Sequence, residues 1–347
     1  MPPNRGRAVW LDADLQATAA SIARVQLVDG SIPWEPGKHV DPWNLVEAAM
    51  GLDEAGRPEA AAAAYGWLAA KQRCDGAWAA GYRGYEVVDA TLDANFSAYP
   101  AVGILHHYLV TGDRSFVESM WPVVDRAIGF VLDLQAPSGE VMWARDAHYE
   151  PWPAALITSS SCIHLSLRCA VALAEIAGEE RPDWELSAEL LRTAVADRSG
   201  RFLDKSRYSM DWYYPVLGGV FTGAEARSIL LDGWDRFVLE GYGVRCVADH
   251  PWITAGETCE LVMALAMTGL EQEARRVFGW IHHLRSPVGA YWTGATFPDG
   301  TIWPRELATW NAGAVLMAAA CLQGSAVKDV LGTGVAEPAS DPISDLL

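Results

Sequence analysis

The chain has 347 residues, of which 51% are hydrophobic and 20% charged, a balance typical of a globular protein with a full-sized core. Its formal net charge of -18 would repel phosphates, which excludes nucleic acid as a partner. The six cysteines form no CxxC pair and show no metal-ligand spacing. No apolar run has the length of a membrane span or a signal sequence. We therefore expect a soluble, cytoplasmic protein that uses neither a metal nor a cofactor.

Apolar residues recur at helical spacing through most of the chain, whereas alternating strand patterns are scarce. The expected helices form pairs that begin near Asp or Pro and end near Gly. In chain order they cover residues 41–56 and 57–76, 93–113 and 114–139, 159–178 and 184–199, 256–269 and 270–284, and finally 307–322. We predict that residues 1–324 form one domain and that residues 325–347, with Gly, Pro, Ser and Asp, form a disordered tail.

A short motif recurs where the second helix of a pair ends: a Gln, then a Gly, then a Trp. It occurs as Gln26/Gly30/Trp34, Gln72/Gly76/Trp78 and Gln135/Gly139/Trp143, with a shorter version at Gly289/Trp292. A Gly at a helix end can adopt the left-handed conformation that closes the helix. Each loop then carries its aromatic residue toward one end of the array. This favours an all-α fold in which helical hairpins close into an (α/α)6 toroid, with the central funnel as the ligand site.

The Gln–Gly–Trp motif resembles the QW repeats of terpenoid cyclases and protein prenyltransferases, which share the toroid. This weaker resemblance implies an isoprenoid substrate whose carbocations are stabilised by the π faces of aromatic rings. Such cyclases protonate an alkene with a DxDD cluster, whereas the nearest stretch here is DATLD at residues 89–93. The Asp, Cys and His set that holds zinc in prenyltransferases has no counterpart in the chain.

A second resemblance covers most of the chain. Residues 40–78, 106–128 and 257–281 are similar, in the same order, to segments of the six-hairpin glycosidases, above all the bacterial glucoamylase- and trehalase-like enzymes. The resemblance implies an α/α toroid that hydrolyses glycosides in its funnel. In that family an Arg-Asp pair at the start of an early inner helix binds hydroxyls of the terminal sugar. The matching pair here is Val40-Asp41, which keeps the carboxylate and lacks the Arg.

The two catalytic carboxyls of that family do not carry over. Its general acid is the Glu of a Trp-Glu-x-Arg loop, where this chain reads Trp143, Ala144, Arg145, Asp146. Its general base lies in a turn before the last helix, where this chain has Thr293 near that position. Inverting hydrolysis needs two carboxyls roughly 6.5–9.5 Å apart, one to protonate the leaving oxygen and one to activate water. Any catalytic pair must therefore be non-standard.

Carboxyls at the expected starts of inner helices are the remaining candidates. We expect Glu260 or Asp146 to donate the proton, because the apolar run after Glu260 would raise its pKa. Glu306 or Asp93 would then act as the base, although Asp93 also fits a helix N-cap. The expected substrate-binding residues are Trp34, Asp41, Asn95, Trp143, Arg145, Asp211, Trp212, Tyr213, Glu257 and Trp310.

These observations predict an enzyme of the six-hairpin glycosidase type that acts on a small carbohydrate or glycoconjugate. Two alternatives stay open. A terpenoid cyclase or prenyltransferase-like protein would need a deeply apolar cavity with one acidic Asp. A catalytically inactive sugar-binding module would have polar and aromatic walls without the carboxyl pair. The sequence indicates no oligomeric state.

Overall fold

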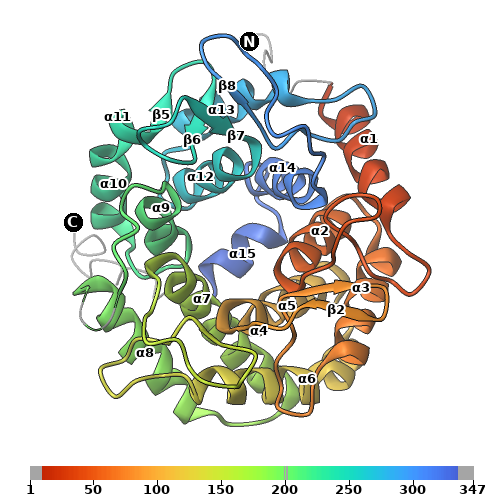
Figure 1. Cartoon of the computed structure of the whole chain (residues 1–347), viewed down its shortest axis with the longest axis vertical. Coiled ribbons are helices and arrows are strands. Elements are labelled where there is room, and N and C mark those ends of the chain that lie inside the picture. Colours follow the sequence, from red (N-terminus) through yellow and green to blue (C-terminus); the bar gives the residue numbers. More distant parts are fainter. Residues whose placement is uncertain (1–9, 199, 201, 335–347) are drawn as a thin grey trace, which may run out of the picture.

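In the part of the chain that the structure describes, six inner helices form a closed ring inside a second layer of helices (Figure 1). The structure is a computed structural model and describes residues 10–198, 200 and 202–334. Each inner helix packs against the next, and the last packs against the first. They are α2 (Pro42–Glu54), α5 (Pro100–Thr111), α7 (Ile157–Ala177), α9 (Met210–Leu217), α12 (Ala255–Met267) and α14 (Thr309–Cys321). The predicted all-α toroid is confirmed.

The outer layer alternates with the inner helices along the chain. It consists of α1 (Trp10–Val25), α3 (Pro58–Lys71), α6 (Arg114–Leu132), α8 (Pro182–Ala196), α10 (Gly223–Asp232) with the short α11 (Trp234–Phe237), and α13 (Glu271–Trp280) with a 3-10 turn, Ile281–Leu284. The two layers differ in their apolar pattern. Inner α12 is buried continuously from its first residue to Ala266, whereas outer α13 buries only one stripe, formed by Ala274, Val277 and Phe278. A helix that is apolar all round must lie inside, and an amphipathic one must cover it.

The segments that lead from each outer helix into the next inner helix gather on one face of the ring, which we call the loop face. They contain the hairpin β1 (Gly81–Arg83) and β2 (Glu86–Asp89), the pair β3 (Leu92–Asp93) and β4 (Ala144–Arg145), and a four-stranded antiparallel sheet of β5 (Val238–Leu239), β6 (Gly243–Arg245), β7 (Trp252–Thr254) and β8 (Gly294–Thr296). Strand β3 runs directly into the short helix α4 (Ala94–Ala98), and β7 into α12. The strands therefore fix the first turns of inner helices.

The Gln–Gly motif joins neighbouring outer helices. The side-chain amides of Gln26, Gln72 and Gln135 each donate to the carbonyl of the Gly four residues later. Each also donates to a carbonyl of the next outer helix, at Ala60, Val123 and Ser187 respectively. The QW-like pattern thus has a structural explanation in how the ring is assembled.

The shorter motif at Gly289 closes the outer layer. The Gly289 carbonyl accepts a hydrogen bond from Thr18 Oγ1 of α1, and Arg24 donates to the neighbouring Val288 carbonyl. A Cβ on Gly289 would stand 2.6 Å from the Ala17 carbonyl oxygen, so only glycine permits this contact. The last hairpin is in this way joined to the first helix.

Residues after the ring do not all form a tail. The expected tail begins at residue 325, but α15 (Ala326–Gly332) is a helix that lies across the centre of the ring, below the loop face (Figure 1). Its Val327, Val330 and Leu331 are buried, and this apolar spacing was overlooked among the Gly and Ser around it. Arg168 of α7 holds its end by donating to the carbonyls of Leu331 and Thr333. Residues 335–347 lie outside the described residues.

Candidate functional site

The loop face brings together carboxyls from the first turns of several inner helices. Asp41 is the N-cap of α2, and Asp93 is the N-cap of α4. Asp211 and Glu257 belong to the first turns of α9 and α12, and Trp310 to the first turn of α14. Helix N-termini favour negative charge, so these positions suit carboxylates. These helix starts follow the segments of the loop face, and the roles of the residues in a site stay a prediction.

An aromatic cluster covers the start of α14. The Trp310 ring lies 5.6 Å from Trp43 and 6.4 Å from Trp34, measured between ring centroids. On its other side it lies against Gly256, which immediately precedes Glu257. Trp34 is half-buried and stacks on the imidazole of His39 at 5.8 Å. Trp310 therefore stands between the start of α2 and the start of α12.

The carboxyl of Glu257 accepts fewer hydrogen bonds than its two oxygens allow. Glu257 is 6% exposed, and among the described residues its hydrogen-bond donor is the Cys246 thiol rather than an N–H or O–H group. The Cys246 thiol lies against it, and the charge of Glu257 contributes to raising the pKa of that thiol, after burial. Because an S–H group is a weak donor, this buried carboxyl keeps acceptor capacity for a ligand.

Asp41 is held by a network at the start of α2. Its Oδ1 accepts the backbone N–H of Asn44 at 2.9 Å, and its Oδ2 accepts the Asn44 amide at 2.5 Å. The Nε2 of His39 lies 3.5 Å from the same Oδ2. This hydrogen bond to Asp41 raises the pKa of His39. The position of His39 beside Asp41 depends on the folded loop, and no motif in the sequence marks it.

Asp93 is saturated with donors. Its Oδ1 accepts the backbone N–H groups of Asn95 and Phe96, and its Oδ2 accepts the Trp143 indole N–H at 2.7 Å. Burial nevertheless raises the pKa of Asp93 to about 6, and the charge of Asp41 adds to the shift. The Oδ1 atom of Asn95 is buried without a partner in the described part of the chain, so Asn95 retains an acceptor for a ligand hydroxyl.

Of the three consecutive residues Asp211 to Tyr213, only Asp211 faces the candidate site, and the two aromatic residues belong to the core. Asp211 Oδ1 accepts two hydrogen bonds from Thr158, and its Oδ2 is buried with no partner among the described residues. Trp212 turns outward, stacks on Phe237 and donates to the Ile229 carbonyl. Tyr213 is fully buried. The expected sugar-stacking role of Trp212 and Tyr213 is therefore corrected, because both rings belong to the packing between helices.

Glu260 and Glu47 lie one turn below the loop face. Both oxygens of Glu260 accept hydroxyl hydrogen bonds, from Tyr213 and Tyr214, and burial raises its pKa to about 8. Glu47 accepts the Tyr99 hydroxyl, and burial raises its pKa to about 7. Both carboxyls border an enclosed, mainly apolar cavity on the ring axis that α15 closes from below. The apolar surroundings of Glu260 were predicted, whereas its two tyrosine donors were not.

The predicted donor Asp146 lies in an exposed turn. Its carboxylate accepts the backbone N–H groups of Glu150 and His148, and these hydrogen bonds lower its pKa. A proton donor must instead hold its proton near neutral pH, so the geometry removes Asp146 from that role. Arg145 lies over the ring of Tyr149 in the same turn. Glu306 contributes its backbone carbonyl to the N–H of Thr293, and its expected role as a base stays a prediction.

One comparison shows the family of the chain. No protein-family profile matches the chain. A protein of Mycolicibacterium hassiacum named MMP endo-(1,4)-3-O-methyl-alpha-D-mannosidase is 46% identical over 323 residues, which are 92% of this chain and 89% of the relative. The chain belongs to the family of this mannosidase.

Solved structures share the fold. A wild-type glycosidase matches with a TM-score of 0.74 at 16% identity, over 92% of this chain and 99% of the other, and a variant in complex with glucose matches equally. A D-mannose isomerase matches with a TM-score of 0.69 at 10% identity, over 93% and 99%. The chain is thus a glycosidase-type enzyme of the six-hairpin fold that acts on carbohydrate, as predicted, whereas the weaker resemblance to terpenoid cyclases gains no support.

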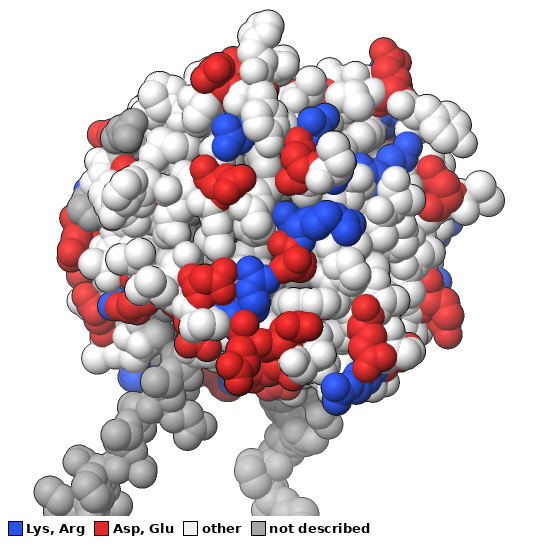
Figure 2. All heavy atoms as spheres, turned by 90° about the horizontal axis from the view of Figure 1, so that it is seen from below, with Lys and Arg blue, Asp and Glu red and all other residues white. Residues whose placement is uncertain are grey.

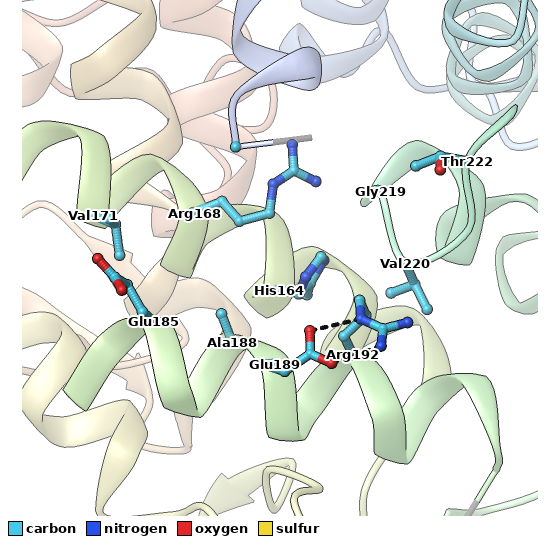
Figure 3. A pocket seen from close by; sticks show the side chains of 11 residues that line it. His164, Arg168, Val171, Glu185, Ala188, Glu189, Arg192, Gly219, Val220 and Thr222 are labelled. Atoms are coloured by element: carbon cyan, nitrogen blue, oxygen red, sulfur yellow. Dashed lines mark hydrogen bonds and ion pairs between the residues drawn. The ribbon is translucent and has the colours of Figure 1, made fainter. Parts of the chain in front are cut away.

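A second cavity of this mannosidase-family chain lies away from the loop face, between α7, α8 and the loop after α9 (Figure 3). His164, Arg168 and the ion-paired Glu189 and Arg192 line it. Arg168 is committed to three backbone carbonyls, and the Nδ1 of His164 bonds to the Gly218 carbonyl. Burial lowers the pKa of His164 to about 4. These groups hold the fold together and offer little to a ligand.

Two further findings bear on the expected absence of metal and membrane span. Within the described residues, no group of three or more His, Cys, Asp or Glu side chains could hold a metal ion. Helix α7 is long and apolar enough to cross a membrane, but it is an inner helix of the ring and most of it is buried.

The surface of the ring is mainly acidic. The view in Figure 2 shows acidic side chains spread over the outside of the ring, with fewer basic ones between them.

Proposed function

We propose that the chain is an endo-acting α-mannosidase that cleaves (1,4)-linked chains of 3-O-methylmannose. The relative that is 46% identical over most of both chains bears this activity in its name. The observation on the molecule that carries the proposal is that the Trp310 indole lies against Gly256, the neighbour of Glu257 in α12, and 5.6 Å from Trp43, which follows Asp41 at the start of α2. Glycoside hydrolysis uses a pair of carboxyls that flank the bond to be broken, and we assign these roles to Glu257 and Asp41.

Glu257 is the proposed proton donor. Its carboxyl is free of N–H and O–H donors among the described residues, so it can form a hydrogen bond to the oxygen of the bond that breaks. Glu260, the donor expected from the sequence, already accepts two tyrosine hydroxyls and is 1% exposed. A sugar at the loop face reaches Glu257 before it reaches Glu260, which lies one turn deeper. We therefore propose that Glu260 forms part of the floor of the sugar-binding site and does not donate the proton.

Asp41 is the proposed base. The neighbouring His39, whose pKa is raised by this contact, places its Nε2 3.5 Å from Asp41 Oδ2 and keeps the carboxyl oriented at the start of α2. An ionised carboxylate can take a proton from the water that attacks the anomeric carbon. Asp93 has three N–H donors on its carboxylate and fits the N-cap of α4 together with hydroxyl binding. This assignment implies a single displacement with inversion at the anomeric carbon.

The test uses the full chain with a 3-O-methylated α-(1,4)-mannan. Wild-type protein should release oligosaccharides from within the chain, and NMR of the first products should show the inverted, β configuration. Glu257→Gln and Asp41→Asn should each lower kcat by roughly 10²–10⁴-fold. Both variants should still bind the polymer, because their shape is unchanged.

Glu260→Gln is the matched control on the same helix. It should keep activity within about tenfold if Glu260 belongs to the floor, since Gln can still pair with both tyrosines. A loss as large as that of Glu257→Gln would return the donor role to Glu260. Release of single sugars from the chain end, or no cleavage of the methylated polymer, would contradict the proposed function.

A further inference from the structure

Two segments of the loop face, 150 residues apart in the chain, share the same pattern of backbone hydrogen bonds. The N–H of Met142 donates to the Leu134 carbonyl, and that of Trp292 donates to the Leu284 carbonyl. The carbonyls of Trp143 and Thr293 then accept the N–H of the first residue of α4 and α12. The stretches 134–152 and 284–303 are therefore equivalent structural elements.

Both stretches end at a Trp that is followed by a Pro, Trp152-Pro153 and Trp303-Pro304. The N–H of Trp152 donates to the Ala144 carbonyl, and the N–H of Trp303 donates to the Gly294 carbonyl, which is the equivalent position. An antiparallel β-bridge pairs Arg145 with Pro151 in the first stretch, and an equivalent β-bridge pairs Ala295 with Ile302 in the second. The two Trp side chains consequently occupy corresponding places in the two halves of the ring.

These corresponding places lie on opposite sides of the loop face. Trp152 comes just before α7, and Trp303 comes just before α14. In the ring, α7 and α14 are separated by two inner helices in either direction, so they face one another across the axis (Figure 1). The proposed catalytic carboxyls belong to α2 and α12, the two neighbours of α14.

Both tryptophans are exposed. Trp152 is 46% and Trp303 is 56% exposed, and no other tryptophan whose side chain the structure describes reaches the exposed range. Each packs against a second indole: Trp152 against Trp143 in a tilted pair at 5.3 Å, and Trp303 against Trp252 in an edge-to-face pair at 5.1 Å. The Trp143 indole is itself fixed to Asp93 of the site. An exposed indole that packs against a second indole has little freedom to lose when a ligand stacks on it.

We propose that Trp152 and Trp303 are sugar-stacking platforms that hold the substrate chain on the two sides of the cleavage point. This inference rests on the proposed function, because only a polymer that extends both ways from the catalytic carboxyls needs both platforms. A 3-O-methyl group adds apolar surface to each sugar, and apolar surface is what an indole face binds. The platforms thus account for endo action by binding internal segments of the chain.

The experiment compares Trp152→Ala and Trp303→Ala on two substrates: the long methylated mannan and the shortest oligosaccharide that wild-type protein cleaves. Each variant should raise KM for the polymer by about 3- to 10-fold, which corresponds to a stacking contribution of about 0.5–1.5 kcal/mol. The kcat values and the KM for the short substrate should stay unchanged. Trp303→Phe should recover part of the polymer affinity, because it restores an aromatic face.

Leu231→Ala is the control, since Leu231 is 52% exposed on outer helix α10 and should leave every parameter unchanged. Unaltered KM for the polymer in both tryptophan variants would overturn the platforms while leaving the proposed function intact. An equal rise in KM for both substrates would also overturn them, because it would mean general damage to the site. Failure of wild-type protein to cleave the methylated polymer would instead reject the proposed function, and with it the platforms as substrate subsites.

Discussion

The indole of Trp310 occupies the space into which a side chain at Gly256 would extend. A Cβ on Gly256 would stand 1.9 Å from Cη2 and 2.2 Å from Cζ3 of that ring. Gly256 precedes Glu257 in the first turn of α12, so the same contact locates the indole and the carboxyl relative to each other. The two groups proposed to bind and to protonate the substrate are thereby held as one unit.

Gly256→Ala should therefore lower activity. The added methyl must displace the indole or the start of α12, and a small misplacement of catalytic groups can cost about 10²-fold. We expect a fall in kcat/KM of at least about tenfold, measured on the methylated polymer. Gly66→Ala in outer α3 is the control, because nothing lies within 4 Å of its added Cβ. If Gly256→Ala is as active as Gly66→Ala, the indole does not position the site.

The buried carboxyls predict how stability depends on pH. Glu260 and Glu47 have folded pKa values of about 8 and about 7, against an ordinary value of 4.5. Between pH 4.5 and 8 the folded chain binds more protons than the unfolded chain, so the free energy of unfolding should fall as the pH rises. Each group can contribute a slope of up to about 1.4 kcal/mol per pH unit. Denaturant unfolding at a series of pH values measures it.

Glu260→Gln should flatten this dependence, because Gln cannot ionise and still bonds to Tyr213 and Tyr214. The difference from wild type should grow toward pH 8 in favour of the variant. A free energy of unfolding that rises from pH 5 to pH 8 in wild-type protein, or an unchanged slope in Glu260→Gln, would show that these carboxyls are ionised in the folded chain.

The Gln–Gly junctions predict a second effect on stability. Gly139 has φ of 101°, and a Cβ there would stand 2.4 Å from the Leu190 carbonyl oxygen of α8. Gly139→Ala should lower the free energy of unfolding by roughly 1–3 kcal/mol or more, through backbone strain and the separation of α6 from α8. Gly129→Ala within α6 is the matched control, since its Cβ meets nothing and alanine favours a helix. Equal melting temperatures for the two variants would contradict this account of the junction.

Replacing Asp146 should change catalytic activity only slightly. Its carboxylate organises a turn and its pKa is lowered, so it should take no part in proton transfer. Asp146→Asn should keep kcat within about threefold of wild type, because an amide oxygen can accept the same N–H groups. The comparison with Glu257→Gln on the same polymer is decisive, since a large loss in Asp146→Asn would restore it as a candidate donor.

Much of the fold could be read from local patterns. The apolar periodicity of residues 255–267 and 309–321 already indicates helices that are buried on all sides. The repeated Gln and Gly mark helix ends, because the left-handed conformation at Gly30, Gly76 and Gly139 is a local property of glycine. Carboxyls at the starts of inner helices follow from the same reading, since a helix N-terminus and its cap are set by neighbouring residues.

The roles of those carboxyls depended on the tertiary structure. Glu257 and Glu260 lie on one face of one helix and look alike in sequence, but only Glu260 has tyrosines of α9 packed against it. Trp212 and Trp310 both follow helix starts, yet Trp212 stacks on Phe237 between the inner and outer helices and Trp310 borders the site. Segments that are distant in the chain supply the hydrogen-bond donors of a carboxyl and determine its burial. Hydrogen bonding and burial in turn decide its pKa and whether a ligand can contact it. Local sequence therefore determined where the carboxyls stand, and the closure of the ring decided which of them a sugar can meet.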